Sequence, residues 1–350
     1  MVKISIIIPI YNVQDYIERC LDSVICQECD DFALECIIVN DCTPDDSINI
    51  VRRKLVDYAG RIDFVILTHQ KNEGLSAARN TGIRSASGDF VFFMDSDDRL
   101  EFGAIKSFVD SFNSVDDISQ VDVVMGNSFL CKNGKQVMSF EKDLPLFFDN
   151  SDETALKNLL NCNIFHTAWN KLIRLEFLLK YNVYFEKGIM EEDLLWSYLI
   201  FLYARGVLVV PRVTYIYEDN PSSIMNTASS RVARVIRSRI VICNQILACP
   251  PKYSFVEYYV YLFYVMSRAV NLFELNKKDS LVGELADDLN KLRNDFLCEV
   301  KKKRFYLLYL FFLTSKRPYY YISNCKWYRR YYDKIAMIMV TISNYCIWKK

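Results

Sequence analysis

The sequence predicts an α/β fold in which a mostly parallel sheet is flanked by helices and followed by a helical C-terminal extension. Three observations predict this class. Over the first hundred residues, short apolar runs alternate with helical patterns, which is typical of parallel sheets. Polar residues directly follow most of these apolar runs. Beyond residue 226 the strand patterns stop, and long helical patterns follow.

Residues 3–10 and 35–39 are predicted to form the first two strands, because nearly continuous apolar runs are typical of strands buried on both faces. Pro9 is expected to end the first strand, since proline cannot donate a hydrogen bond. Asn12 is then predicted to cap a helix whose apolar positions recur every three or four residues.

The alternation continues with a helix that begins after the polar turn at 43–47 and a strand at 63–68. A polar loop at 69–74 leads into a helix over 75–85. Five apolar residues, 90–94, three of them aromatic, predict a fourth buried strand.

The later elements are predicted from the same two periodicities. The predicted strands are 121–130, 136–140 after a turn at Asn133 and Gly134, 207–210 and 213–217, and the predicted helices are 174–181, 191–205, 232–247, 255–275 and 281–297. We therefore expect a catalytic domain at 1–228 and a helical region at 229–350.

Three carboxylates, Asp95, Asp97 and Asp98, follow the fourth strand. In an extended chain alternate side chains share a face, so Asp95 and Asp97 are expected to converge. Two carboxylates suit Mg²⁺ or Mn²⁺ and leave coordination positions for phosphate oxygens. The alternative is an acidic turn in which Asp98 caps the next helix.

The carboxyl ends of the predicted strands carry the polar residues of the first hundred positions. These ends are residues 9–11, 40–41, 69–72 and 95–97. Ligands of open parallel sheets bind outside the carboxyl ends of the strands. This coincidence favours the metal site over the acidic turn.

Composition excludes several classes of protein. The 350 residues carry no net charge, which argues against a nucleic-acid-binding protein. The sequence contains neither G-x-G nor GxxxxGK[ST], so the dinucleotide-binding and P-loop motifs are absent. The start of the sequence predicts no signal peptide, and twelve cysteines then indicate reduced thiols in a cytoplasm.

The C-terminal fifty residues are strongly basic, with twelve Lys or Arg and one acid. Their apolar runs at 304–313 and 335–348 are too short to span a bilayer. Basic flanks and aromatic rings are typical of peripheral segments that lie on an anionic membrane surface. The alternative is a packing element against the catalytic core or a second subunit of a homo-oligomer.

Five segments in order resemble the family 2 inverting glycosyltransferases of the GT-A fold, over roughly residues 3–225. These segments are 4–12, 38–47, 72–82, 95–98 and 192–193. The resemblance implies a bacterial surface-polysaccharide enzyme of the hexosyl- or N-acetylhexosaminyl-transferase type. Such an enzyme would move a sugar from a UDP-sugar donor to a hydroxyl of a glycan or lipid-linked acceptor.

The resemblance also implies roles for individual residues. The nucleotide-sugar-binding set would comprise Pro9, Tyr11, Asp41, Asn72, Arg79 and Asp95. Asp95 and Asp97 match the family's D-x-D motif, which holds Mn²⁺ or Mg²⁺ against the diphosphate. Asp193 matches the catalytic base, with Glu192 as its neighbour, and Trp169 and Lys171 resemble a W-x-K segment near the acceptor.

The sequence departs from the family pattern at two places. Asn40 and Cys42 replace an Asp and a Gly on either side of Asp41, and Glu218 stands where many relatives have an arginine. Because Asp41 remains, uridine recognition is still expected.

Alternatives remain for several of these residues. Arg79 could be a solvated helix residue, although a guanidinium beside an open strand end suits contacts to oxygens. The acids at 191–193 could simply stabilise a helix N-terminus. At the level of the whole chain, the alternatives are a nucleotide-sugar pyrophosphorylase, disfavoured because no Gly-rich loop follows the first strand, and a catalytically degenerate scaffold.

Overall fold

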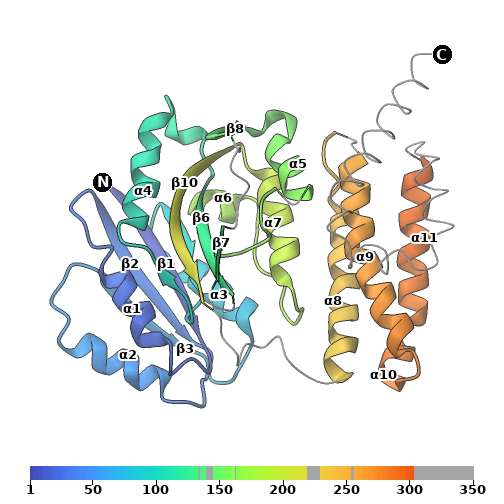
Figure 1. Ribbon diagram of the computed structural model, residues 1–350, viewed down its shortest axis with the longest axis horizontal. Coiled ribbons are helices and arrows are strands. Elements are labelled where there is room, and N and C mark those ends of the chain that lie inside the picture. The colour runs from blue at the N-terminus through green and yellow to red at the C-terminus, as the bar shows by residue number, and fades with distance from the viewer. Residues whose placement is uncertain (133–134, 139–144, 162, 219–228, 254–255, 303–350) are drawn as a thin grey trace. The chain divides into compact units, whose positions relative to one another are not determined.

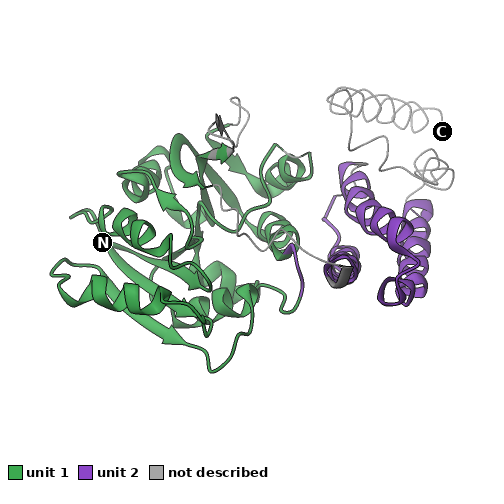
Figure 2. Ribbon diagram, turned by 60° about the horizontal axis from the view of Figure 1, so that its bottom comes forward, with its two compact units in different colours: residues 1–188, 192–225 green, residues 189–191, 226–350 purple. Residues whose placement is uncertain are grey.

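The computed structural model describes residues 1–132, 135–138, 145–161, 163–218, 229–253 and 256–302 (Figure 1). It divides into two compact units, which Figure 2 colours green and purple. Unit 1 comprises residues 1–188 and 192–225, and unit 2 comprises residues 189–191 and 226–350. The predicted boundary at residue 228 falls outside the described residues and stays a prediction.

Unit 1 contains all the strands of the described chain. They are β1 (Val2–Ile10), β2 (Phe32–Asn40), β3 (Asp63–Thr68), β4 (Phe90–Phe93), β5 (Arg99–Leu100), β6 (Val123–Lys132), β7 (Lys135–Met138), β8 (Phe147–Asp149), β9 (Lys171–Arg174) and β10 (Gly206–Tyr217). Its α-helices are α1 (Ile17–Ile25), α2 (Ser47–Val56), α3 (Leu75–Ser85), α4 (Ala104–Ser111), α5 (Thr154–Leu160), α6 (Leu175–Lys180) and α7 (Glu192–Tyr203).

The strands form one sheet in the order β3-β2-β1-β4-β9-β6-β10-β5, with β7 beside β6 and β8 beside β10. The first four strands pair in parallel, as do β6 and β10. The short strand β9 runs antiparallel to both of its neighbours, β4 and β6. The predicted α/β class with helices flanking a largely parallel sheet is confirmed, and its solved relatives are compared below.

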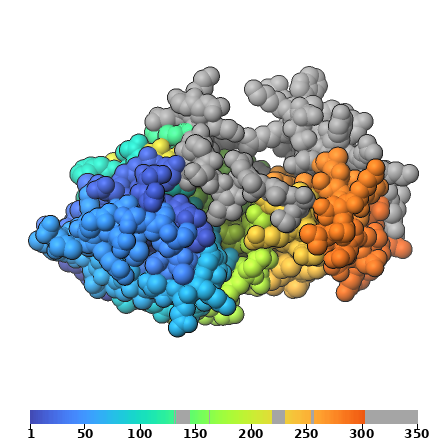
Figure 3. All heavy atoms as spheres, turned by 90° about the horizontal axis from the view of Figure 1, so that it is seen from below, coloured from blue at the N-terminus to red at the C-terminus, as the bar shows by residue number. Residues whose placement is uncertain are grey.

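The centre of the sheet is apolar on both faces. Ile6 of β1 lies between Cys36 and Phe92 of the neighbouring strands, and all three side chains are fully buried. Leu21 of α1 joins the same core cluster. Burial of such apolar surface is the main favourable contribution to folding, at about 25 cal/mol per Å². In Figure 3, which is coloured by residue number, the N-terminal part of unit 1, including α1 and α2, is blue.

Two expectations about β1 and α1 are wrong. β1 continues through Pro9 to Ile10, since β4 pairs with β1 only as far as Ile7 and a proline is tolerated where one side of a strand is unpaired. Asn12 does not cap α1, which begins at Ile17. Instead Asn12 has a φ of 55°, and its N–H donates to Thr43 Oγ1 at 2.9 Å.

Two later elements also differ from the sequence patterns. The predicted strands at 207–210 and 213–217 are the single strand β10, whose register against β6 shifts twice beside Pro211. These irregularities accommodate a proline inside a strand. The predicted helix at 281–297 is two helices, of which the second begins at Ala286.

Unit 2 contains the helices α8 (Ser229–Ala248), α9 (Val256–Asn276), α10 (Ser280–Gly283) and α11 (Ala286–Lys302). Their apolar faces bury aromatic and aliphatic side chains such as Ile236, Val265 and Phe296. Within the described ranges, no helix combines the length and apolar character needed to cross a membrane. The basic segment at 303–350 lies outside those ranges.

At the amino ends of the strands, Glu35 joins three parts of the sheet. Its carboxylate accepts hydrogen bonds from Ser5 Oγ, from Ser87 N–H at 2.6 Å and from Ser87 Oγ at 2.7 Å. Lys3 Nζ lies 3.3 Å away. Burial acts to raise the pKa of Glu35, but the hydrogen bonds from Ser5 and Ser87 lower it below the ordinary value of 4.5.

We predict that Glu35→Gln lowers the free energy of unfolding at pH 7 by about 1–3 kcal/mol, the usual cost of disturbing a buried hydrogen-bonded group. Because the pKa is lowered in the folded state, this stabilisation is complete above the ordinary pKa and is lost as the pH falls through the folded value. Urea unfolding of both proteins at pH 7 and under acid conditions measures the difference.

The matched control is Asp63→Asn, which removes an exposed carboxylate at the start of β3 and is expected to change stability little. A difference between parent and Glu35→Gln that stays constant with pH would contradict the prediction.

Candidate active site

Arg79 of α3 brings together carboxylates from two distant parts of unit 1. Its Nη2 donates to Asp95 Oδ1 at 2.8 Å, after the end of β4. Its Nη1 donates to Glu192 Oε1 at 2.9 Å and to Asp193 Oδ1 at 3.0 Å, in the first turn of α7. One guanidinium therefore connects the D-x-D segment to the predicted catalytic acids.

The guanidinium is buried, with 1% of Arg79 exposed. The guanidinium carbon of Arg79, Cζ, lies 5.0 Å from the centroid of the Phe185 ring, which is a cation–π contact. Burial acts to lower the pKa of Arg79, but the carboxylates of Asp193, Asp95 and Glu192 raise it well above its usual range. Arg79 is thus a permanent buried cation, and the interpretation as a solvated helix residue is wrong.

The two acids of α7 differ in their surroundings. Burial and the neighbouring Asp193 raise the pKa of Glu192 to about 7, against the opposing effect of Arg79. Burial also raises the pKa of Asp193, while Arg79 and the Ala168 N–H, 3.1 Å from Oδ2, favour its ionised form. Burial thus opposes ionisation of Asp193, and the pairing with Arg79 supplies the compensating charge.

Lys171, at the start of β9, lies near the same acids. Burial lowers its pKa to about 7, and the charge of Asp193 partly offsets this effect. Its Nζ donates to Thr167 O at 2.7 Å and to Thr167 Oγ1 at 2.8 Å. A buried amine beside a buried carboxylate can stabilise that carboxylate without contacting it directly.

The D-x-D residues lie in a turn, because β4 ends at Phe93 and the N–H of Asp98 donates to Asp95 O at 3.2 Å. The expectation that Asp95 and Asp97 converge along an extended strand is therefore wrong. Asp98 is fully buried, and its Oδ2 accepts a bond from Tyr215 Oη at 2.7 Å. Asp98 thus anchors the turn to β10 and does not cap a helix.

The carboxylates of this turn are candidate ligands for a hard cation. Asp95 and Asp97 are both partly exposed. Burial is the main cause that raises the pKa of Asp98, and the charges of Asp95 and Asp97 raise it further. Among the described residues, no group of three or more acidic, His or Cys side chains could hold a metal ion. Two carboxylates are nevertheless what Mg²⁺ commonly takes from a protein when phosphate oxygens complete its shell.

Asp41, after β2, accepts three hydrogen bonds from within unit 1. Its Oδ1 accepts from Glu73 N–H at 2.8 Å, its Oδ2 accepts from Gly74 N–H at 2.7 Å, and His69 Nδ1 lies 2.7 Å from Oδ1. Four lone pairs on the carboxylate leave one for a ligand. Asp41 therefore holds the loop that leads into α3, a role that the sequence did not indicate.

The remaining predicted donor residues lie along the same edge. Pro9 is buried in β1, while Tyr11 and Asn72 are exposed in loops beyond β1 and β3. The N–H of Asp41 donates to Ile10 O at 3.0 Å, which ties the ends of β1 and β2 together. Cys42 has a φ of 55°, a left-handed conformation that favours glycine, the residue that the resemblance implies for this position.

Trp169 packs in an aromatic stack with two tyrosines of β10. Its ring centroid is 4.6 Å from that of Tyr215 and 5.8 Å from that of Tyr217. Tyr215 Oη also accepts a bond from the Asp95 N–H at 3.1 Å. The stack therefore contacts the D-x-D turn through Tyr215, and Trp169 is mainly a packing residue.

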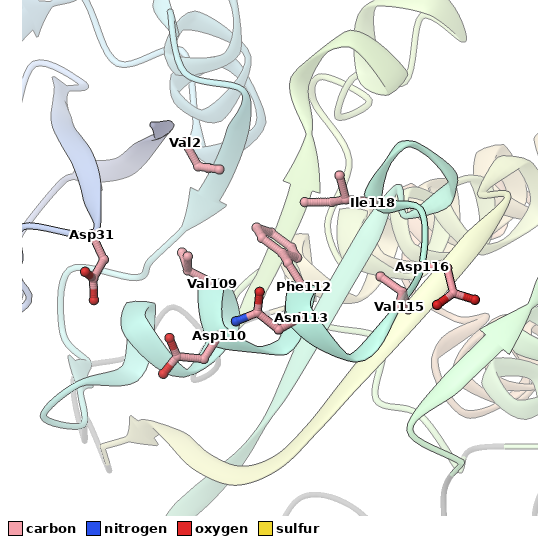
Figure 4. Close-up of a pocket in the computed structure, with 9 residues that line it drawn as sticks. All are labelled: Val2, Asp31, Val109, Asp110, Phe112, Asn113, Val115, Asp116 and Ile118. Carbon is pink, nitrogen blue, oxygen red and sulfur yellow. The ribbon is translucent and has the colours of Figure 1, made fainter.

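A shallow cavity of about 550 Å³ lies at the other end of the strands (Figure 4). Its lining includes Val2 at the start of β1, Asp31 just before β2 and Phe112 after α4. Because the candidate site lies at the carboxyl ends of β1 and β4, this cavity is not part of it.

Sequence analysis did not assign His69 and Tyr215 to this region, and it gave Asp98 only a capping role. His69 Nε2 lies 3.0 Å from Thr81 Oγ1 while its other nitrogen contacts Asp41, so it bridges β3 and α3. Its position directly after a strand was the only available signal. Nothing in the sequence spacing indicates that Tyr215 contacts the D-x-D turn 120 residues earlier.

Comparison with known proteins finds similarity to glycosyltransferases. The glycosyl transferase family 2 model matches residues 5–174. EpsJ of Bacillus subtilis, described as an uncharacterized glycosyltransferase, is 32% identical over 225 residues, which cover 63% of this chain and 62% of EpsJ. TarS of Staphylococcus aureus, a poly(ribitol-phosphate) β-N-acetylglucosaminyltransferase, is 28% identical over 223 residues, 62% of this chain and 35% of TarS. The chain thus spans less than two thirds of either relative.

Solved structures show the same fold. Residues 1–349 of S. aureus TarS in complex with UDP-GlcNAc superpose with a TM-score of 0.64 at 21% identity, over 84% of this chain and 80% of that one. A mannosyltransferase from Pyrobaculum calidifontis, in complex with GDP-mannose and Mn²⁺, gives a TM-score of 0.52 at 15% identity, over 81% and 78% of the chains. The fold is therefore GT-A.

Proposed function

We propose that this chain, which carries a family 2 glycosyltransferase domain of the GT-A fold, transfers a sugar from a UDP-sugar to an acceptor hydroxyl. One observation carries the proposal. Arg79 gathers the acid of the D-x-D turn and the two acids of α7 into one cluster at the carboxyl ends of the strands. A transferase needs carboxylates in such an arrangement, because the donor and the acceptor must bind side by side with a proton acceptor next to them.

The donor side of the proposal rests on the ends of β1, β2 and β4. Asp41 is positioned there with one lone pair for a base, and Pro9 and Tyr11 flank the adjoining strand end. A solved TarS structure contains UDP-GlcNAc, while the solved mannosyltransferase contains GDP-mannose. We favour a UDP-sugar carrying a hexosyl or N-acetylhexosaminyl group, and a GDP-sugar is the competing donor.

Asp95 and Asp97 would hold Mn²⁺ or Mg²⁺ in this proposal. When bound, the cation supplies a Lewis acid that stabilises charge on the departing diphosphate. Asp95 also has a structural role. Its Oδ1 accepts a hydrogen bond from Arg79, and this bond connects the turn to α3. Asp97 makes the cleaner test of metal binding for that reason.

On the acceptor side, Asp193 would take the proton from the attacking hydroxyl. The acceptor oxygen forms the new bond to the anomeric carbon as the bond to the diphosphate oxygen breaks, so a single displacement inverts the configuration. The raised pKa of Asp193 makes it a stronger base, and Arg79 keeps a cation beside it in the ionised state. Lys171 adds a second nearby positive charge when protonated.

The acceptor is a glycan or a lipid-linked glycan in this proposal, and the pathway is the synthesis of a bacterial surface polysaccharide. The names of the relatives, such as the poly(ribitol-phosphate) transferase TarS, support that class of acceptor. We further propose a cytoplasmic site of action. We also propose that the basic tail contacts an anionic membrane or a second subunit. The tail lies in residues 303–350, outside the described part of the chain.

We predict that Asp97→Ala weakens Mn²⁺-dependent binding of UDP by at least about tenfold, or about 1.4 kcal/mol, because the diphosphate loses part of its counter-charge. Thermal unfolding with UDP, with and without Mn²⁺, measures this as a lost shift in Tm. Asp116→Ala, which removes an exposed acid far from the turn, is the matched control. Undiminished sugar transfer by the parent in excess EDTA would rule out the metal.

We predict that Asp193→Asn slows sugar transfer at least about a hundredfold while UDP and Mn²⁺ still bind as in the parent. The amide keeps the shape and the oxygen that accepts from Ala168 N–H but removes the basicity. Release of UDP from a panel of UDP-sugars, with a polysaccharide acceptor, gives the rates. Glu192→Gln serves as the comparison, since it removes the neighbouring acid.

An equal loss of binding and turnover in Asp193→Asn would mark Asp193 as structural. Parental turnover would move the base elsewhere, with Glu192 as the next candidate. A parent that binds UDP-sugars but transfers none of them would instead support the degenerate scaffold.

A further inference from the structure

His69 contacts the carboxylate of Asp41, the residue that would bind the base of the donor. Its Nδ1 lies 2.7 Å from Asp41 Oδ1, and its Nε2 lies 3.0 Å from Thr81 Oγ1. The His69 N–H donates to Asn40 O at 2.9 Å, which fixes the backbone of His69 beside the end of β2. The side chains of His69 and Asp41 are 11% and 4% exposed, so water competes little for this contact. All four residues belong to unit 1.

The hydrogen bonds of Thr81 indicate which ring nitrogen of His69 carries a hydrogen. Arg84 Nη2 donates to Thr81 Oγ1 at 3.2 Å, so the one hydroxyl hydrogen of Thr81 is available to His69 Nε2. A neutral imidazole whose Nε2 accepts carries its hydrogen on Nδ1, and protonated His69 would also donate from Nδ1. We therefore assign Nδ1 as the donor to Asp41, since an ionised carboxylate only accepts.

This assignment sets the number of hydrogen bonds that Asp41 can accept from a ligand. Its Oδ1 accepts from Glu73 N–H at 2.8 Å and from His69 Nδ1, which together use both lone pairs of that oxygen. Its Oδ2 accepts from Gly74 N–H at 2.7 Å, and within the described chain that is the single partner of Oδ2. A ligand therefore finds one open acceptor position, on Oδ2.

Uracil and guanine differ in the number of donors that they present to such an acceptor. Uracil has one N–H on its pairing edge, at N3, between two carbonyl groups. Guanine has two adjacent donors, N1–H and the N2 amino group, which pair side by side with the two oxygens of a carboxylate. A carboxylate with one open position matches uracil, whereas it leaves one guanine donor without a partner. Sites that leave a polar group of the ligand unpaired discriminate strongly against that ligand.

We propose that His69 is a specificity-determining residue for the donor. It occupies the position on Asp41 Oδ1 that a guanine would need, and the site thereby selects a uracil nucleotide. This inference rests on the proposed function, since it deepens the assignment of Asp41 to the donor base and favours a UDP-sugar over a GDP-sugar. His69 acts through Asp41 and is a positioning residue, because its effect requires no contact with the base.

The test measures the binding of UDP and of GDP, each with Mn²⁺, by isothermal titration calorimetry on the full-length chain. His69→Phe keeps an aromatic ring and removes the donor. His69→Asn places an amide N–H close to the position of Nδ1–H, and it is the conservative variant that should restore the parental behaviour. Asp63→Asn, at the exposed start of β3, is the control on the strand that precedes His69. The quantity compared is the Kd for GDP divided by the Kd for UDP.

We expect the parent to bind UDP at least about tenfold more tightly than GDP, because an unpaired donor has a cost of that size. In His69→Phe the ratio should fall at least about fivefold, since the released position on Oδ1 can accept the second guanine donor. His69→Asn and Asp63→Asn should keep the ratio within about twofold of the parent. If His69→Phe has no folding transition without nucleotide, His69→Leu, which also lacks a donor, replaces it.

A parental ratio in His69→Phe would overturn the inference, and so would an equal weakening of UDP and GDP, which a purely structural residue would cause. The same change in His69→Asn as in His69→Phe would show that the donated hydrogen bond is not the cause. Failure of the proposed function is distinguishable, because binding is measured without an acceptor. A chain that selects UDP through His69 but transfers no sugar would support the inference and contradict the proposed transfer, and a parent that binds neither nucleotide would contradict both.

Discussion

The buried guanidinium of Arg79 is the interaction on which the candidate site depends. It is 1% exposed and pairs with carboxylates 16, 113 and 114 residues away in the sequence. Burying the Arg79 cation without partners would be costly, and the three partly exposed carboxylates compensate its charge. The cluster therefore requires α3, the D-x-D turn and the start of α7 to occupy one relative arrangement.

The rest of the edge is built to keep α3 in place. Asp41 binds the N–H groups of Glu73 and Gly74 directly before α3, and Gly74 has a φ of 89° that glycine adopts without strain. Hydrogen bonds of Tyr215 to Asp98 and to the Asp95 N–H fix the D-x-D turn to β10. Each of these groups has hydrogen-bond partners within the protein, so contacts of the protein itself organise the edge. A preorganised site of this kind avoids reorganisation during a reaction.

Much of the fold could be predicted because its parallel strands and helices have strong periodicity. The strand at 63–68 and the helix at 75–85 match the structure to the residue. Short elements such as β5, β8 and β9 could not be found, since two to four residues carry no detectable period and are specified by tertiary pairing. The acids and Arg79 were recognisable from motifs, but their mutual contacts were not. Nor could the ion pairs of Glu191 be foreseen, because its partners Arg239 and Arg268 lie nearly fifty and eighty residues later.

The most direct test of the central role of Arg79 is the free energy of unfolding of Arg79→Met, measured in urea at neutral pH with a chelator present. Removing one partner from a buried ion cluster typically costs about 3–5 kcal/mol, because the remaining charges stay buried without compensation. The account predicts a loss in that range, although methionine fills much of the volume of the side chain. A loss below about 1 kcal/mol, as expected of a solvated arginine on a helix surface, would contradict it.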